Sequence, residues 1–273
     1  MRTPIFQIDA FATRRFAGNP AAVMPMDRFL DDTVLQAIAA ENNLAETAFL
    51  VREGTGNDYR LRWFTPLVEV PLCGHATLAS AAVVMERLEP GRGKLIFHST
   101  SGPLKVHRAN TDTDTDTDTY TNKRYVMDFP ARPSEPVWSP PGLAEALGTV
   151  PVEVFGNAFN YMAVLESAQL LRALAPDMAA IARMDRPGVI VTAPGDESYD
   201  FVSRYFAPVK GIPEDPVTGA AHCMLAPYWS KRLGEFRAYQ ASRRGGEVTC
   251  RLSRDRVELE GSCVFYLEGE VDI

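Results

Sequence analysis

The chain has 273 residues, of which 46% are hydrophobic and 23% are charged, which is enough for one large or two ordinary domains with full cores. Its longest apolar run, around residues 76–85, is far shorter than the roughly 20 residues of a membrane span, and its first residues do not resemble a leader peptide, so we expect a cytoplasmic protein. The net charge of -7, with no cluster of lysine or arginine, disfavours nucleic acid and membranes as partners and favours a small molecule.

The first half of the chain predicts a mixture of helices and strands. Asp31 and Asp32 are suited to cap a helix that ends near residues 42–43. Residues 48–51 form an apolar segment typical of a buried strand, and residues 59–64 alternate as a second strand. A helix is expected over residues 74–88, and because it is apolar nearly all round, we expect it to be surrounded by protein.

Two features of the chain disfavour metal binding. The segment TDTDTDTDT at residues 111–119 is polar and of low complexity, and it lacks the glycine and glutamate of a calcium loop, so a disordered surface insertion is predicted. The cysteines are scattered and form no C-x-x-C pair, which predicts reduced thiols and neither disulfides nor a zinc site. They are Cys73, Cys223, Cys250 and Cys263.

The second half predicts the same kinds of element. Strands are expected at residues 152–155, 162–165, 189–192 and 201–206. One long helix is expected at residues 216–233. This helix resembles the one at residues 74–88 in its small and apolar residues. Each half is therefore predicted to place strands around a central apolar helix.

An internal repeat relates the two halves. RWFTP at Arg62 matches RYFAP at Arg204, 142 residues later, and in this register Cys73 matches Asp215. Weaker matches lie upstream at similar spacing. The proline-rich residues 131–142 are a suitable connector. We therefore predict an α+β protein with two pseudo-symmetric domains, 1–130 and 131–273.

Each copy of the repeat leads into a helix start, where free backbone N–H groups and the helix dipole favour a carboxylate or another anion. Asp215 and Pro216 are typical of an N-cap and a first helical residue, so Asp215 is as well explained by capping as by catalysis. Cys73 takes that place in the first copy, either as a thiol favoured in its ionised form by the dipole or as a small buried residue. Gly74 and Gly219 would let a ligand approach the backbone closely.

Two further polar residues are candidates for chemistry. His75 lies at the first helix start, and we weigh a functional and a structural role for it equally. Glu46 precedes a fully apolar strand, and the second half has Pro187 in the matching place. An exposed charge is the commoner explanation for Glu46, but partial burial beside such a strand is what suits a carboxylate to general acid/base catalysis.

The chain resembles the phenazine-biosynthesis-like (PhzF) isomerase family, whose fold is related to that of diaminopimelate epimerase. The matching stretches are QIDAFAT with FAGNPAAV, NNLAETAFL, RWFTPLVEVPLCGHATLASA, SRYFAPVKGIPEDPVTGAAH and RGGEV. The resemblance implies two domains, each with strands curled around a central helix, an active site in the cleft between them, no cofactor and a homodimer.

The resemblance also implies roles for individual residues. The family's catalytic glutamate matches Glu46, and supporting roles fall to His75 and Asp215. Substrate binding falls to the residues around the two helix starts, namely Cys73, Gly74, Thr218, Gly219 and Ala220. Many relatives have serine where this chain has Ala220, so a hydroxyl contact is lost there.

Three functions remain open on the sequence alone. The favoured one is a one-base isomerase in which Glu46 moves a proton between two carbons of a small molecule that bears a carboxylate, for example trans-2,3-dihydro-3-hydroxyanthranilate. The second is a two-base epimerase or racemase that uses Cys73 and Asp215. The third is a protein that keeps the fold and binds a ligand without turnover.

Overall fold

The computed structural model describes residues 2–273 except 55, 57, 110–122, 197 and 231–235. Contacts divide the chain into two units, one of residues 1–128 and 260–273 and the other of residues 129–259. The predicted insertion at residues 111–119 lies outside the described residues.

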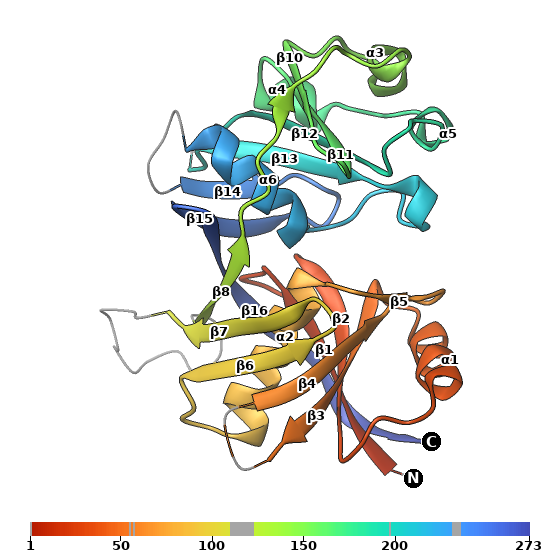
Figure 1. The fold of residues 1–273 in the computed structure, drawn as a ribbon, viewed down its shortest axis with the longest axis vertical. Helices are drawn as coiled ribbons and strands as arrows, with labels where there is room; N and C mark the ends of the chain where they lie inside the picture. The colour runs from red at the N-terminus through yellow and green to blue at the C-terminus, as the bar shows by residue number, and fades with distance from the viewer. Residues whose placement is uncertain (1, 55, 57, 110–122, 197, 231–235) are drawn as a thin grey trace. The chain divides into compact units, whose positions relative to one another are not determined.

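The first unit contains most of the strands of the amino-terminal half and the end of the last strand (Figure 1). Its elements are β1 (Arg2–Ala10), β2 (Asn19–Met26), α1 (Asp32–Asn42), β3 (Glu46–Glu53), β4 (Asp58–Phe64), β5 (Glu69–Val70), α2 (Gly74–Val83), the π-helical turn η1 (Val84–Leu88), β6 (Lys94–Ser99), β7 (Gly102–Arg108), β8 (Arg124–Pro130) and the end of β16 (Arg256–Asp272).

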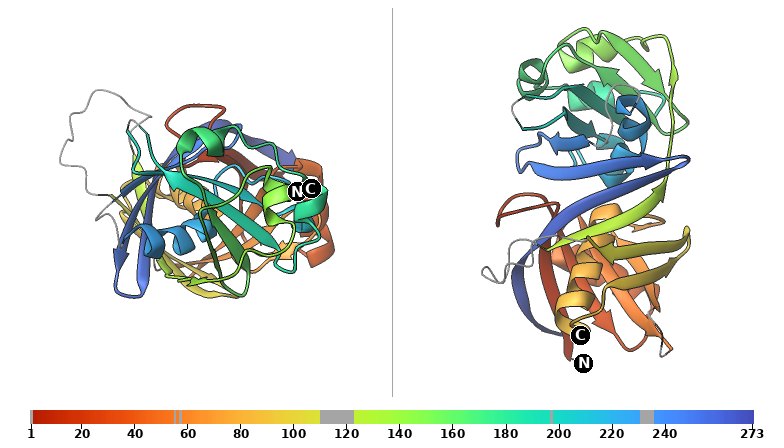
Figure 2. Two further views of the ribbon diagram at one scale, coloured as in Figure 1. Left: turned by 90° about the horizontal axis from the view of Figure 1, so that it is seen from above. Right: turned by 90° about the vertical axis from the view of Figure 1, so that its left-hand side faces the viewer.

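These strands close into a barrel. The order is β1-β2-β3-β4-β6-β7-β8-β16, and β16 also pairs with β1. The β1–β16 pairing is antiparallel from Arg2 with Asp272 to Ala10 with Cys263, so the two chain ends lie side by side in this unit (Figure 2). The predicted carboxyl-terminal boundary of the second domain, at residue 273, was therefore wrong. Residues 260–273 belong to the first unit, because they are hydrogen bonded to β1.

Helix α2 provides the core of the first unit. Every residue from His75 to Val83 is buried, and the helix contacts β1, β2 and β3. An alanine-rich segment forms a helix readily, and one that is apolar all round is stable only when protein surrounds it. Together with η1, which ends at Leu88, the element confirms the helix predicted over residues 74–88.

Helix α1 packs elsewhere in the same unit. Its buried residues Leu35 and Ala39 contact a cluster that includes Phe49 of β3 and Phe64 of β4. Asn43 ends the helix in the left-handed conformation, which asparagine tolerates better than most residues. The predicted end near residues 42–43 is confirmed, and the chain turns there directly toward β3.

The second unit repeats the pattern of strands and one buried helix. Its elements are β9 (Glu135–Pro136), α3 (Leu143–Leu147), β10 (Glu153–Gly156), β11 (Asn160–Val164), α4 (Ala168–Arg172), α5 (Met178–Ile181), β12 (Gly188–Pro194), β13 (Phe201–Phe206), the 3-10 turn η2 (Pro208–Lys210), α6 (Gly219–Trp229), β14 (Phe236–Gln240), β15 (Gly246–Ser253) and the start of β16.

The strand order in this unit is β16-β15-β14-β13-β12-β11-β10-β9. Pairings β11–β12 and β13–β14 are parallel, as are β2–β3 and β4–β6 in the first unit. Helix α6 is buried along nearly its whole length and contacts β15. The predicted strands of this half are confirmed, but the helix begins at Gly219 rather than near Pro216. Among the described residues, no helix is long and apolar enough to cross a membrane.

Candidate active site

Glu46 is a buried carboxylate at the start of β3. The chain reaches it just after the left-handed residue Asn43, and β3 then runs parallel to β2 with Glu46 opposite Ala21. Only 11% of the Glu46 side chain is exposed. The commoner explanation from sequence, an exposed charge at a helix–strand junction, was therefore wrong, because Glu46 is the first residue of β3 and its side chain is buried against His75.

His75 brings Glu46 together with the start of α2. Its Nε2 atom lies 3.1 Å from Glu46 Oε2. On the other side of the ring, Nδ1 lies 3.5 Å from Cys73 Sγ and is hydrogen bonded to Asn19 Nδ2 at 3.1 Å. Cys73 is the N-cap of α2 and has an extended backbone. Residues from β2, β3 and the entry to α2 thus meet around one imidazole.

The charges of this cluster follow from its burial. Burial alone lowers the pKa of His75, but the neighbouring Cys73 and Glu46 outweigh it and hold that pKa well above its usual value. Burial, and then the negative charge of Glu46, raises the pKa of Cys73 to about 11. At neutral pH Cys73 is therefore a neutral thiol, and His75 faces Glu46 through Nε2. The dipole of α2 does not make Cys73 a thiolate, because desolvation has the larger effect.

Asn19 is a member of this cluster that the sequence analysis missed. It is fully buried at the start of β2 and follows Gly18, whose φ of +66° places the turn in the left-handed region. A side chain at Gly18 would lie 2.2 Å from the carbonyl oxygen of Ala10. In the sequence the Gly-Asn pair stands only within the stretch FAGNPAAV, and nothing local to it indicates a histidine partner.

Asp215 is buried in the second unit, but it does not cap α6. The N-cap is Thr218, so the prediction that Asp215 caps the helix with Pro216 as its first residue was wrong. Thr218 Oγ1 donates a hydrogen bond to Asp215 Oδ2 at 2.5 Å, and the Asp215 N–H donates to the carbonyl of Tyr205 at 3.0 Å. These bonds hold the segment in a turn. Cys73 and Thr218 are therefore the residues that occupy the same N-cap position in α2 and α6, whereas the repeat in the sequence aligns Cys73 with Asp215.

Gln240 fixes this turn and was also missed from the sequence. It is fully buried at the end of β14. Its Nε2 donates to the Asp215 carbonyl at 2.7 Å and to Thr218 Oγ1 at 3.1 Å, while its Oε1 accepts from the Thr218 N–H at 2.8 Å. One amide therefore holds both predicted site residues, although nothing in the sequence around Gln240 marks it.

The repeated arginines have a matching structural role in the two units. Arg62 binds Glu69 through two hydrogen bonds of 2.7 Å each. Arg204 binds Glu214 through bonds of 2.6 and 3.1 Å. Each glutamate lies between the strand of its arginine and the next long helix, Glu69 in the short strand β5 and Glu214 in the segment before α6. Two-pronged pairs of this kind fix geometry as well as charge, so the repeat preserves the loops that carry Cys73 and Asp215.

The remaining predicted binding residues lie where the helices begin. Gly74 is half-buried at the start of α2, and Gly219 is buried at the start of α6, where Ala220 is exposed. Glu46, Cys73, His75 and Gly74 are therefore brought together in the first unit. Asp215, Thr218, Gly219 and Ala220 are brought together in the second. Their roles in substrate binding stay predictions.

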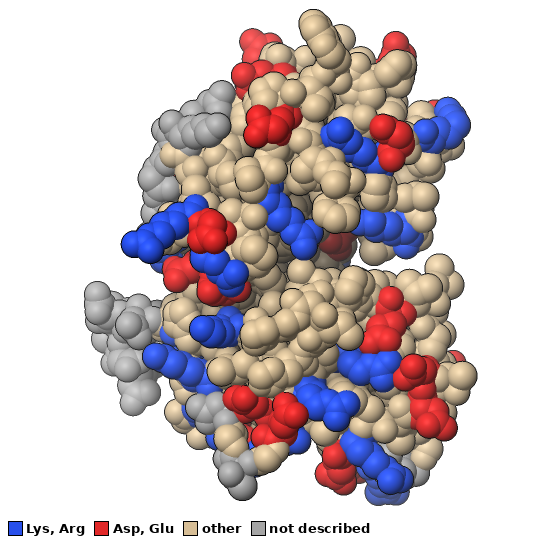
Figure 3. All heavy atoms as spheres, viewed as in Figure 1, with Lys and Arg blue, Asp and Glu red and all other residues tan. Residues whose placement is uncertain are grey.

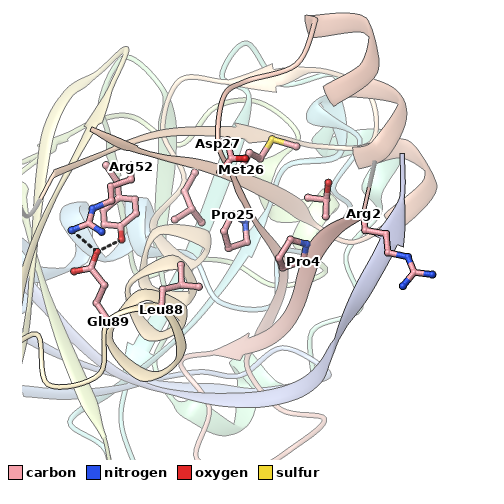
Figure 4. Close-up of a pocket in the computed structure, with 11 residues that line it drawn as sticks. Arg2, Pro4, Pro25, Met26, Asp27, Arg52, Leu88 and Glu89 are labelled. Atoms are coloured by element: carbon pink, nitrogen blue, oxygen red, sulfur yellow. Dashed lines mark hydrogen bonds and ion pairs between the residues drawn. The ribbon is translucent and has the colours of Figure 1, made fainter. Parts of the chain in front are cut away.

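A cavity of about 320 Å³ lies elsewhere in the first unit (Figure 4). Pro4, Pro25 and Leu88 are among its apolar lining residues, and at one end Glu89 accepts a hydrogen bond from Tyr59 at 2.6 Å. Arg52, which pairs with Glu89 at 3.3 Å, lies near the end of β3, whereas Glu46 starts that strand. None of the predicted site residues lines this cavity.

The surface charges are mixed. On the face shown in Figure 3, lysine and arginine side chains alternate with aspartate and glutamate in both units, and broad areas carry neither. The predictions that the protein binds neither nucleic acid nor membrane, and that it forms a homodimer, stay predictions.

Comparison with known proteins places this geometry in a family. The sequence profile of the phenazine biosynthesis-like protein family, PhzC-PhzF, matches residues 8–269. An uncharacterized isomerase of Pseudomonas aeruginosa is 48% identical over 273 residues, which cover 99% of each chain. A crystal structure of a PhzF-family phenazine biosynthesis protein from Enterococcus faecalis is 42% identical, with a TM-score of 0.91 over all of both chains.

A more distant likeness concerns the fold alone. A probable proline racemase from Agrobacterium radiobacter superposes with a TM-score of 0.64 at 9% identity, over 99% of this chain and 93% of the other. The predicted α+β class, with two units of curled strands and a central helix, is therefore confirmed. The chain belongs to the phenazine biosynthesis-like (PhzC-PhzF) family and is an isomerase.

Proposed function

We propose that the protein is a cofactor-independent isomerase that moves a proton between two carbons of a small carboxylate-bearing molecule, with Glu46 as its general acid/base. The observation that carries the proposal is the buried pair of Glu46 and His75, whose Oε2 and Nε2 atoms are 3.1 Å apart. A carboxylate held in a largely dry place by one histidine contact can accept a proton without first shedding a shell of water.

The proton balance of the reaction needs one base. The Glu46 carboxylate takes a proton from a carbon made acidic by a neighbouring unsaturated system, and the electron pair moves into that system. The protonated Glu46 then returns the proton to another carbon on the same face. His75, whose Nε2 lies 3.1 Å from Glu46 Oε2, holds the carboxylate in place through the cycle.

Backbone and polar groups complete the proposal. The first N–H groups of α2, at Gly74 and His75, are suited to hold a carboxylate, since the first N–H groups of a helix have no partner within it. Asp215 keeps the supporting role that the family resemblance assigns to it, and its fixed position on Thr218 and Gln240 is consistent with that role.

A two-base epimerase is less well supported by the electrostatics. Such an enzyme needs a thiolate that accepts a proton from carbon, but burial raises the pKa of Cys73 to about 11. The thiol can give up its proton at neutral pH only if substrate binding stabilises the thiolate. The likeness to a probable proline racemase is a likeness of fold and does not alter this comparison.

Proton NMR in deuterated water tests the proposal. The purified protein is incubated with trans-2,3-dihydro-3-hydroxyanthranilate, the substrate that the resemblance implies, beside Glu46→Gln. Migration of the double bond in the wild type and its loss in Glu46→Gln is the expected result. If the compound is unchanged, a panel of amino acids screened for α-deuterium exchange tests the epimerase instead, and exchange there would overturn the one-base proposal.

A further inference from the structure

The ring of His75 is held at both of its nitrogens. Nε2 lies 3.1 Å from Glu46 Oε2, and Nδ1 lies 3.1 Å from Asn19 Nδ2 and 3.5 Å from Cys73 Sγ. In the described part of the chain these three side chains are the polar partners of the ring. Because the bond at one ring nitrogen decides what the other nitrogen presents, the partners of Nδ1 control the side of the ring that faces Glu46.

Asn19 is the stronger of the two partners of Nδ1. A thiol is a weak donor and a weak acceptor, and Cys73 Sγ is also the more distant atom, whereas an asparagine amide both donates and accepts well. The amide can therefore bond Nδ1 in either of its forms, through the amide nitrogen when Nδ1 carries no proton and through the amide oxygen when it does. This property suits a histidine beside a carboxylate that transfers protons, because the ring stays oriented throughout.

The backbone of Asn19 is itself fixed by β2 and by the turn before it. Asn19 is the first residue of β2, pairs with Ala10 of β1 and is fully buried. The preceding Gly18 has a φ of +66°, and its backbone approaches the Ala10 carbonyl so closely that a Cβ there would lie 2.2 Å from the oxygen. The amide thus reaches the ring from a strand, and a strand holds a side chain more precisely than a loop does.

We propose that Asn19 is a positioning residue of the isomerase, which holds Nδ1 of His75 and thereby keeps Nε2 facing Glu46. Asn19 acts through the ring, since it lies against Nδ1 while the carboxylate lies against the opposite nitrogen. The effect on turnover rests on the proposed function of Glu46, whereas the effect on the ring rests on the geometry of the cluster. It extends the site to β2, 56 residues before the histidine that it orients.

Nitrogen-15 NMR of the full chain, labelled at its four histidines, tests the effect on the ring without any turnover assay. We expect a ring N–H signal from Nε2 of His75 that exchanges slowly with water, because the residue is buried, and His75→Gln identifies it. Asn19→Leu should abolish or shift this signal, because the ring loses its partner at Nδ1. Asn160→Leu, which removes another buried asparagine amide from the second unit, is the control and should keep the signal.

A second variant keeps the NMR test decisive if Asn19→Leu does not fold. Asn19→Ala removes the amide without adding bulk, and the same loss or shift of the His75 signal is expected. Circular dichroism checks that each variant is folded. Absence of the signal in the wild type, or an unchanged signal in a folded variant that lacks the Asn19 amide, would overturn the proposal.

Steady-state kinetics then separates positioning from substrate binding. With trans-2,3-dihydro-3-hydroxyanthranilate as substrate, Asn19→Leu should lower kcat by roughly 10–100-fold, the usual effect of removing the outer hydrogen-bond partner of a functional histidine. The KM should change less than about threefold, because the amide bonds the ring and not the substrate. Asn19→Asp still accepts a hydrogen bond from Nδ1–H, so its kcat should exceed that of Asn19→Leu.

Two kinetic results would contradict the positioning role. A raised KM with unchanged kcat in Asn19→Leu would make Asn19 a substrate-binding residue instead, and equal kcat values for the aspartate and leucine variants would show that the hydrogen bond to Nδ1 has no effect on turnover. If the wild type shows no isomerase activity, the proposed function fails while the His75 signal still decides whether Asn19 holds the ring, so the two failures are distinguishable.

Discussion

Glu46 and His75 form a buried ion pair in the first unit. Replacement of Glu46 by glutamine keeps the shape of the side chain but removes the proton acceptor, so kcat should fall by roughly 10²–10⁴-fold, the usual contribution of a general base. Glu41→Gln, which removes an exposed carboxylate from α1, is the matched control and should retain wild-type activity. Steady-state kinetics with equal kcat for Glu46→Gln and wild type would exclude Glu46 as the base.

Cys73 separates the one-base from the two-base mechanism at the same scale. Its raised pKa of about 11 means that it is a thiol at neutral pH. We expect Cys73→Ser to lower kcat less than about tenfold, because the thiol touches His75 but carries no proton in the one-base cycle. Loss of all activity in a folded Cys73→Ser variant, measured by the same NMR assay, would support the epimerase.

At the scale of elements, the turn before α6 depends on β14. Gln240→Leu would leave the Thr218 N–H and the Asp215 carbonyl without their partner, and a buried unpaired group costs about 1–3 kcal/mol. We expect a loss of that size in the free energy of unfolding, measured with urea. Gln169→Leu, an exposed glutamine on α4, is the control, and equal losses in the two variants would show that the amide's contacts contribute nothing.

Helix α6 should also make stability depend on pH. His222 is fully buried, its Nδ1–H donates to the Thr218 carbonyl at 2.8 Å, and burial lowers its pKa to about 4. Between pH 6.5 and 4 the unfolded chain binds a proton that the folded chain does not. Stability is therefore lost as the pH falls through this window, by about 3 kcal/mol in all.

Urea unfolding at several pH values checks this expectation. His222→Gln should flatten the pH dependence of the unfolding free energy between pH 6.5 and 4, whatever its effect at pH 7. His107→Gln, on β7, controls for the removal of a histidine as such. A pH dependence unchanged in His222→Gln would mean that other groups cause the acid loss.

At the scale of the whole molecule, β16 joins the last residues of the chain to the first strand. Its antiparallel pairing with β1 closes the barrel of the first unit around α2. Removal of residues 260–273 should expose the β1 edge and the buried face of α2, and should abolish cooperative unfolding of that unit. Hydrogen exchange of the amides of Ile5–Ala10 reports the change directly. Protection that survives the truncation would contradict the assignment of β16 to this unit.

The main elements and the pairs of similar segments follow from the amino-acid sequence alone. Alanine-rich apolar residues can be stable only as a buried helix, and the arginines at 62 and 204 mark matching loops, so α2, α6 and the repeated halves follow from local pattern. The candidate residues Glu46, Cys73 and His75 were also found, because they lie at the ends of strongly patterned elements.

Which residues meet in the folded chain depends on its three-dimensional packing. The contacts of Asn19 with His75 and of Gln240 with Asp215 join segments far apart in the chain, and such pairings leave no periodic trace. The return of residues 260–273 to the first unit depends on backbone hydrogen bonds to β1, which any sequence with strand character can make. The protonation of Cys73 likewise depends on burial, a property of the packed fold and not of the helix start that the sequence shows.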